Sequence, residues 1–189
     1  FEKPLIKILA FMEIEGIEVD SKFLKSLSQK FKQKILKLEQ EIFKLSKKEF
    51  NIGSPKQLGE IYKDLKIAGL KKTKKGGFAT SASVLEDLAF KGNKFPALIL
   101  NWRQLSKLKN TYSDALPEHV NPKTKRVHTS FLLAATTTGR LASSDPNLQN
   151  IPIKSDDGKN IRKAFQAKKD YLLISADYNQ IEMRILADL

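Results

Sequence analysis

Apolar side chains recur at helical spacing through most of the first half of the chain. The clearest case begins after Asp20 and Ser21, either of which can cap a helix that we expect to run to about Glu49. Its apolar positions are three or four residues apart, so they form one packing stripe on a helix whose other faces are rich in lysine. The stripe consists of Leu24, Leu27, Phe31, Ile35, Leu38, Ile42 and Leu45.

Shorter helices are predicted on both sides of this long one. One covers residues 4–15, and another begins at Pro55, with Ser54 as its N-terminal cap. A further helix spans about 96–116, and Pro117 is expected to stop it because proline cannot continue a helical hydrogen-bond ladder. The first part of the chain is therefore predicted to be mainly helical.

A basic loop interrupts these helices at residues 70–77. Its lysines and two glycines suit contact with a phosphate backbone in which no base is read. After it, Ser83 and Glu86 have the spacing of a capping box, which predicts the start of a short helix there.

The pattern changes after Pro117. Residues 126–135 mix β-branched and aromatic side chains and predict a strand, whereas 136–152 are rich in turn-forming residues and predict a loop. Residues 171–177, Tyr-Leu-Leu-Ile-Ser-Ala-Asp, are mostly apolar and predict a short strand covered on both faces. Helical spacing resumes at Ile181. The fold class that these elements predict is α+β, with the domain boundary near Pro117.

Composition narrows the class of partner and the cellular compartment. The net charge is +13, with the excess of lysine concentrated before Pro117, which suits a polyanionic partner; a lysine-rich proteome explains the charge equally well. There are no cysteines, so disulfides and thiolate metal sites are excluded. No apolar run is long enough to span a membrane, and the start lacks the pattern of a signal peptide. We therefore expect a cytoplasmic protein with no membrane partner.

Asp177 is the first candidate for chemistry. It lies where the predicted strand ends and a helix begins, and a carboxylate at a strand end is a suitable hard-oxygen ligand for Mg²⁺. Glu182 follows five residues later and could line the same pocket. Taken alone, the pair is more simply explained as a helix cap and an exposed side chain.

Two longer motifs weigh against that simpler explanation. Residues 177–184, Asp-Tyr-Asn-Gln-Ile-Glu-Met-Arg, closely resemble the first palm motif of family A DNA polymerases, the bacterial DNA polymerase I type. Residues 136–144, Thr-Thr-Thr-Gly-Arg-Leu-Ala-Ser-Ser, and 146–152, Pro-Asn-Leu-Gln-Asn-Ile-Pro, resemble another stretch of the same family in the correct order and spacing. Further matches at 107–112 and 121–129 extend the resemblance over the whole chain.

The resemblance implies an architecture and a reaction. Residues 1–117 would form a helical thumb, and 118–189 would form the first part of an antiparallel palm sheet that stays incomplete. The parent reaction would be template-directed addition of deoxynucleotides to a primer 3′ end in DNA replication and repair. Its partners would be primer–template DNA and deoxynucleoside triphosphates, with a monomeric protein in the bacterial cytoplasm, associated with the nucleoid.

The same resemblance implies roles at the predicted catalytic end. Asp177 would bridge two Mg²⁺ ions, and the backbone carbonyl of Tyr178 would complete one metal shell. Glu182 would act as a steric gate that excludes a ribose 2′-hydroxyl. Gln180 and Arg184 would support the nucleotide pocket.

A second set of side chains is implied to hold the DNA. Minor-groove acceptors occur at every base pair, so side-chain donors there can test pair geometry and ignore base identity. The matching positions are Arg140, Asn147, Gln149 and Asn150. Arg103 and Lys107 match positions that contact the primer–template backbone, although ordinary surface charge explains these two equally well.

Three positions depart from the family pattern: Ala142 and Asn179 stand where serine is usual, and Met183 where leucine is usual. None of these changes removes the metal ligand, the gate or the minor-groove arginine. The family's fingers helix and second catalytic aspartate do not occur in the 189 residues, so we expect a fragment of a longer polymerase that is inactive alone.

Two alternatives stay open. One is a non-catalytic module that binds duplex DNA independently of sequence. The other is an RNA-synthesising or lesion-tolerant relative that shares the palm motif; the glutamate gate argues against ribonucleotide use.

Overall fold

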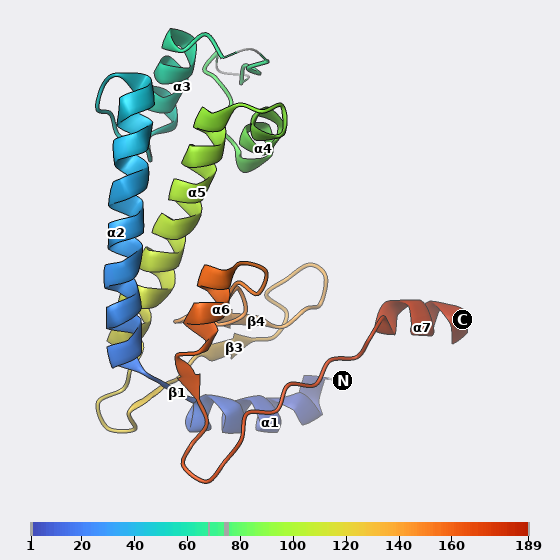
Figure 1. Cartoon of the computed structure of the whole chain (residues 1–189). Coiled ribbons are helices and arrows are strands. Elements are labelled where there is room, and N and C mark those ends of the chain that lie inside the picture. Colours follow the sequence, from blue (N-terminus) through green and yellow to red (C-terminus); the bar gives the residue numbers. More distant parts are fainter. Residues whose placement is uncertain (1, 68, 74–75, 189) are drawn as a thin grey trace.

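Two long helices lie side by side as an antiparallel hairpin above a smaller body of short strands and helices (Figure 1). The computed structural model describes residues 2–67, 69–73 and 76–188. Its helices are α1 (Glu2–Glu15), α2 (Ser21–Ser46), α3 (Pro55–Asp64), α4 (Ala82–Phe90), α5 (Lys94–Leu108), α6 (Asp156–Arg162) and α7 (Ile181–Asp188). A π-helical turn, η1 (Lys109–Asp114), and a 3-10 turn, η2 (Leu116–His119), follow α5. The strands are β1 (Ile17–Val19), β2 (Arg126–Val127), β3 (Ser130–Leu132), β4 (Ala142–Ser144) and β5 (Phe165–Gln166).

The long helix α2 begins as predicted and ends slightly earlier. The Asp20 carboxylate caps it by accepting a hydrogen bond from the Phe23 amide at 2.8 Å. Lys47 adopts a left-handed conformation with φ of 57° and ends the helix. Most of the apolar stripe packs inward, but Leu45, one residue from the last helical position, is 39% exposed.

The predicted start of α3 is confirmed, whereas the predicted start of α4 is wrong. The Ser54 hydroxyl accepts a hydrogen bond from the Gln57 amide, and Pro55 is the first residue of α3. The capping box is wrong, because Ser81 precedes α4 and Ser83 therefore lies inside the helix. In the basic loop, Lys74 and Lys75 lie outside the described residues.

The helix predicted for 96–116 has three parts. The α-helical part, α5, ends at Leu108, and the chain continues through the π turn η1 into the 3-10 turn η2. Pro117 occupies one of the first positions of η2, where its missing N–H is unimportant, so it does not stop the helical path. The prediction that Pro117 ends the helix is therefore wrong.

The β structure consists of two small antiparallel sheets. One has the order β2-β1-β5, with Ile17 opposite Val127 and Val19 opposite Phe165; the other pairs β3 with β4. The strand predicted for 126–135 is thus divided into β2 and β3. The α+β fold class is confirmed.

The strand predicted for 171–177 is wrong. This segment is extended but unpaired within the described residues, and Leu172 and Ile174 are 88% and 89% exposed. A strand needs a neighbour to accept its backbone hydrogen bonds, and the described part of the chain places none beside it. The apolar side chains alone could not reveal this, because they indicate a buried strand whether or not its partners are present.

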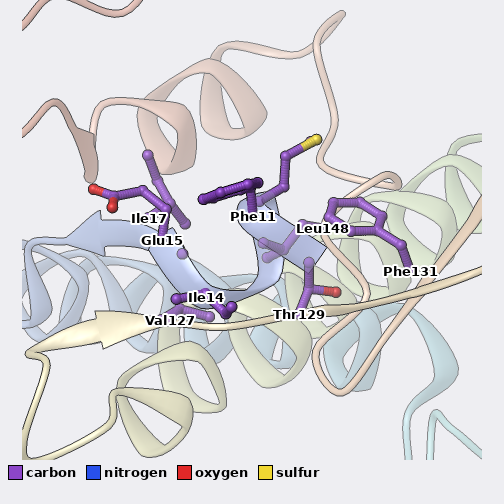
Figure 2. Close-up of a pocket in the computed structure, with 10 residues that line it drawn as sticks. Phe11, Ile14, Glu15, Ile17, Val127, Thr129, Phe131 and Leu148 are labelled. Atoms are coloured by element: carbon purple, nitrogen blue, oxygen red, sulfur yellow. The ribbon is translucent and has the colours of Figure 1, made fainter. Parts of the chain in front are cut away.

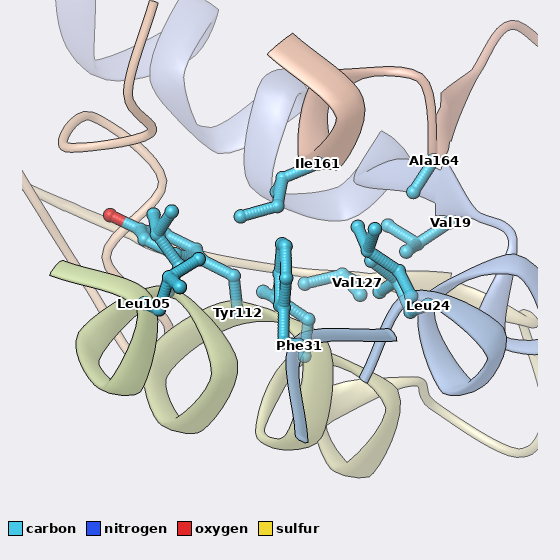
Figure 3. Packing of buried hydrophobic residues seen from close by; sticks show 11 residues of the cluster. Val19, Leu24, Phe31, Leu105, Tyr112, Val127, Ile161 and Ala164 are labelled. Atoms are coloured by element: carbon cyan, nitrogen blue, oxygen red, sulfur yellow. The ribbon is translucent and has the colours of Figure 1, made fainter. Parts of the chain in front are cut away.

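Two hydrophobic clusters hold the fold together. The lower cluster joins α2 and the end of α5 to β1, β2 and α6, as Figure 3 shows; its buried members include Val19, Leu24, Leu27, Phe31, Leu105, Leu108, Tyr112, Leu116, Val127, Ile161 and Ala164. The upper cluster joins the other end of α2 to α3, α4 and the start of α5 around Ile42, Tyr62 and Ile99. Residues on both sides of position 117 share the lower cluster, while the division into thumb and palm stays a prediction.

Candidate functional site

The loop at 146–152 turns its amide side chains outward and its apolar side chains inward. Leu148 and Ile151 pack against the lower cluster, whereas Asn147, Gln149 and Asn150 are exposed. This apolar pair fixes the loop to the core. The exposed amides are therefore presented from an anchored backbone.

Side chains from distant parts of the chain hold the carbonyl groups of this loop. The Tyr112 hydroxyl, on η1, donates a hydrogen bond to the Asn150 carbonyl oxygen. Arg162, at the end of α6, places Nη2 3.1 Å from the Ile151 carbonyl oxygen and Nε 3.3 Å from that of Pro152. Three successive backbone carbonyls are thus fixed by two side chains.

A buried hydroxyl pair supports the beginning of the loop. Thr129 Oγ1 lies 2.8 Å from the Pro146 carbonyl oxygen and 2.6 Å from the Ser143 hydroxyl. Ser143 Oγ accepts a hydrogen bond from the Leu148 amide at 3.1 Å. Since Thr129 and Ser143 are only 8% and 4% exposed, these contacts are sheltered from water and hold the loop against β4.

Two of the exposed amides also make contacts within the protein. Asn147 Oδ1 accepts from the Gln149 backbone amide at 3.0 Å, and Gln149 Nε2 donates to the Leu141 carbonyl at 3.0 Å. These bonds orient both side chains. Each primary amide nitrogen carries two N–H groups, so Gln149 keeps one and Asn147 keeps both for a ligand.

Arg140 lies just before β4, on the turn that leads to this loop. Thr136 Oγ1 donates to the Arg140 carbonyl at 2.8 Å, and Gly139 has a φ of +70°, a left-handed conformation that glycine adopts without strain. The arginine side chain is exposed. The Arg140 cation therefore lies on the connection between β3 and β4, shortly before the loop with the outward-facing amides.

Arg103 and Lys107 occupy successive turns of α5 but different environments. Arg103 is half-buried and donates through Nη1 to the Thr80 carbonyl, which ties α5 to the segment before α4. Lys107 is exposed in the last turn of α5. Part of the Arg103 guanidinium is thus used inside the protein, whereas the Lys107 ammonium is available to solvent.

The second predicted group, around Asp177, stands apart from the lower body on the segment that ends in α7 (Figure 1). Asp177, Tyr178 and Glu182 are all exposed, and the described residues show no hydrogen bond or ion pair to either carboxylate. The same described residues contain no group of three or more acidic, histidine or cysteine side chains placed to hold a metal ion. The structure therefore does not bring the predicted metal-binding residues, Asp177 and Tyr178, together with the predicted DNA-binding residues in one site.

The start of α7 is organised by two residues of the motif. Gln180 has a φ of 51°, and its carbonyl accepts hydrogen bonds from the amides of Met183 and Arg184. Arg184 Nε donates back to the Asn179 carbonyl at 3.1 Å. These contacts give the motif a defined turn, although none of the strands among the described residues pairs with it.

An apolar groove of about 640 Å³ lies between the end of α1 and the segment that contains β2 and β3 (Figure 2). The end of α1 forms one wall through Phe11 and Ile14, and Val127 and Phe131 form another. None of the predicted site residues lines it, but Leu148 does. The groove is thus connected to the back of the amide loop and not to its exposed side.

Comparison with known proteins gives one consistent result. The family model described as DNA polymerase family A matches residues 21–189. DNA polymerase I of Rhizobium leguminosarum is 55% identical over 187 residues, covering 98% of this chain and 18% of that protein. DNA polymerase I of Pseudomonas aeruginosa is 48% identical, covering all of this chain and 21% of that protein. The chain thus spans about a fifth of the length of these curated relatives.

The fold comparison agrees with the sequence comparison. The POL domain of Pol1 from M. smegmatis, in complex with DNA primer-template and dNTP, superimposes with a TM-score of 0.87 at 39% identity. That match covers 98% of this chain and 33% of the solved chain. Separately, within the described residues no helix combines the length and the apolar character needed to cross a bilayer.

The residues that support the loop were missed by sequence reasoning. Tyr112 carried a usable signal, because it lies four residues after Leu108 on the apolar face of the predicted helix, where a tyrosine hydroxyl needs a partner. Thr129 and Arg162 carried none, since each reads as an ordinary polar residue until the fold places it beside the loop.

Proposed function

The chain belongs to DNA polymerase family A, and from this premise we propose that it carries the duplex-holding surface and the first metal-binding carboxylate of a DNA-directed DNA polymerase. The whole enzyme would add deoxynucleotides to a primer 3′ end under the direction of a template, in DNA replication and repair. The observation that carries this proposal is the anchored loop with outward-facing amides, beside the exposed Arg140.

The duplex surface suits binding that ignores base identity. Purine N3 and pyrimidine O2 acceptors are present in the minor groove of every base pair, and the N–H groups of Asn147, Gln149, Asn150 and Arg140 are donors that match them. Lys107, and the free part of the Arg103 guanidinium, would contact backbone phosphates. The net charge of +13 favours the same polyanionic partner.

The catalytic end supplies part of a magnesium shell. The Asp177 carboxylate and the Tyr178 carbonyl are hard oxygen donors, the ligand type that Mg²⁺ takes alongside water and substrate phosphates. Bound Mg²⁺ ions would favour ionisation of the primer 3′-hydroxyl and neutralise charge on the triphosphate. Both residues are exposed, which suits contact with a nucleotide and with ligands from elsewhere in the enzyme.

The remaining residues of the motif would shape the nucleotide pocket. Glu182 lies in the first turn of α7, where its carboxylate would block a ribose 2′-hydroxyl. Gln180 and Arg184 would hold that turn in place through the contacts described above, leaving the Gln180 amide for the nucleotide.

For the 189-residue chain by itself we propose duplex binding without synthesis. This second behaviour is supported because the described residues contain no cluster of three or more acidic, histidine or cysteine side chains placed to hold a metal ion, and a two-metal site needs ligands for both ions. The chain would therefore act as a sequence-independent duplex-binding module.

Two assays test the proposal on the same preparation. Fluorescence anisotropy with a mixed-sequence primer–template should show binding that weakens steeply as salt rises, because phosphate contacts release counterions. Primer extension with Mg²⁺ and deoxynucleotides should show no product. A salt-independent affinity would overturn the duplex surface, and extension would overturn the inactivity of the chain.

A further inference from the structure

Residues 107–112 match the family but have little part in the proposed function, and most of them lie in an uncommon backbone. Lys109–Asp114 form a π-helical turn directly after α5. Such turns are rare and frequently occur at functional sites. This one packs against α2 and carries Tyr112 and Ser113 into the interior, at 2% and 1% exposure.

Side-chain contacts stabilise the five-residue spacing of this turn. Lys109 and Asp114 form an ion pair, although neighbours on an α-helix are three or four residues apart. Asp114 Oδ1 also accepts from the Ser28 hydroxyl on α2 at 2.6 Å, and Ser113 Oγ donates to the Lys109 carbonyl at 3.0 Å. The turn is thus fastened to α2, and this fixes the direction in which the Tyr112 side chain leaves the helix.

That direction brings one polar atom to the loop. The Tyr112 ring packs in the lower cluster among side chains such as Leu105 and Phe31 (Figure 3), while its hydroxyl reaches the Asn150 carbonyl. The same Asn150 residue carries an exposed amide. Fixing its carbonyl fixes the peptide plane that follows, and with it the path of the loop toward Ile151.

We propose that Tyr112 is a positioning residue for DNA, which holds the amide loop in the geometry that meets minor-groove acceptors. The inference rests on the proposed function of the loop and assigns a task to a side chain that does not touch DNA. Without the hydroxyl, the Asn150 carbonyl loses its partner and the loop gains conformations in which its amides miss the groove. Phosphate contacts from lysines elsewhere are unaffected.

The chain offers a matched control for this substitution. Tyr62 is a second buried tyrosine, in the upper cluster, and its hydroxyl has no hydrogen-bond partner within the described residues. Tyr62→Phe and Tyr112→Phe remove the same atom from equally buried rings. They differ in whether that atom holds the loop.

The experiment compares two duplexes of one sequence, measured by anisotropy with the full 189-residue chain. One duplex is natural, and the other contains 3-deazapurines, which lack the minor-groove N3 acceptor. The wild-type chain should prefer the natural duplex by about tenfold, which is within the range for a well-placed groove contact. Tyr112→Phe should reduce this preference to less than about twofold, and Tyr62→Phe should keep it.

The outcomes separate the two proposals. No preference in the wild type would overturn the groove contact and the positioning role with it. A preference that Tyr112→Phe keeps in full would overturn the positioning role alone.

Ser28→Ala, which loosens Asp114 without altering the tyrosine, provides a second variant and should lose part of the preference. Amide hydrogen exchange should become faster at residues 147–151 in Tyr112→Phe and stay unchanged in α5; equal acceleration in both would show general destabilisation and refute the assignment.

Discussion

Lys34 Nζ on α2 lies 2.7 Å from Asp157 Oδ1 on α6, although the two residues are 123 positions apart in the chain. Asp157 belongs to the first turn of α6, where a negative charge also interacts favourably with the helix dipole. The pair joins the helical hairpin to the segment that follows the amide loop. It adds a polar contact to the apolar packing that Ile161 of α6 makes in the lower cluster.

Lys34→Met should lower the free energy of unfolding by less than about 1 kcal/mol, because the lysine is 53% exposed and surface ion pairs contribute little. Urea unfolding at low and high salt would measure it, and the difference should disappear in 1 M salt. Lys32→Met is the control, since this exposed lysine makes no ion pair with a described residue. A loss of several kcal/mol that persists in high salt would contradict this description.

Phe31→Ala should lower the free energy of unfolding by about 3–5 kcal/mol, because its fully buried ring would leave a cavity in the lower cluster. Phe90→Ala removes the same group from a ring that is 95% exposed and should change stability by less than about 0.5 kcal/mol. Urea denaturation midpoints measure both. Equal losses would show that the lower cluster is not packed as described.

Acid should weaken the π turn through Asp114. Burial raises the pKa of this carboxyl, but hydrogen bonds from Lys109 and Ser28 and the charge of Lys109 outweigh burial and lower it below its ordinary value of 3.8. A carboxyl with a lowered folded pKa stabilises the fold above its unfolded pKa, and this stability is lost as the pH falls through the folded pKa.

The corresponding measurement is thermal unfolding between pH 6 and pH 2. Asp114→Asn should be less stable than the wild type at pH 6, and the gap should narrow as the pH falls below about 3.8. A gap that stays constant down to pH 2 would show that the carboxylate charge does not stabilise the turn.

Asp177→Ala separates chemistry from DNA binding. In this chain it should leave duplex affinity unchanged, because the exposed carboxylate makes no contact with the described duplex group. In a complete polymerase that carries the chain, synthesis should fall by at least about a thousandfold, since a metal ligand contributes several kcal/mol to the transition state. Asp170→Ala is the matched control. Retained synthesis in Asp177→Ala would remove the metal-ligand assignment.

Glu182→Ala tests the sugar gate in the same complete enzyme. Incorporation of ribonucleotides relative to deoxynucleotides should rise, because the carboxylate that excludes the 2′-hydroxyl is gone. The ratio of kcat/KM values for the two sugars measures the effect. Asp188→Ala, which removes a carboxylate further along α7, should leave the ratio unchanged, and an unchanged ratio in Glu182→Ala would refute the gate.

The sequence predicted helices correctly where residues close together in the chain determine where a helix begins and which face it buries. Asp20 and Ser54 cap helices through contacts three residues away, and the apolar stripe of α2 packs as its spacing indicates. The family was identified from the residues of short motifs and from their order and spacing, and the comparisons confirm it. Both kinds of inference need no knowledge of distant contacts.

The predictions that were wrong or missing depend on residues that are far apart in the sequence. The segment at 171–177 has the composition of a strand, but a strand also needs partners that composition does not reveal. The supports of the amide loop come from η1, the β2–β3 connection and α6, which are brought together only by folding. Thr129 and Arg162 therefore could not be recognised, and the metal-ligand role of Asp177 stays a prediction that Asp177→Ala tests.

The two hydrophobic clusters share α2, and Leu38 on this helix packs against both. This one helix therefore contributes packing to both clusters, the lower one beside the amide loop and the upper one around α3 and α4. Removing the Leu38 side chain would take apolar contacts from both at once, so a single truncation would be felt at the two ends of the helix together.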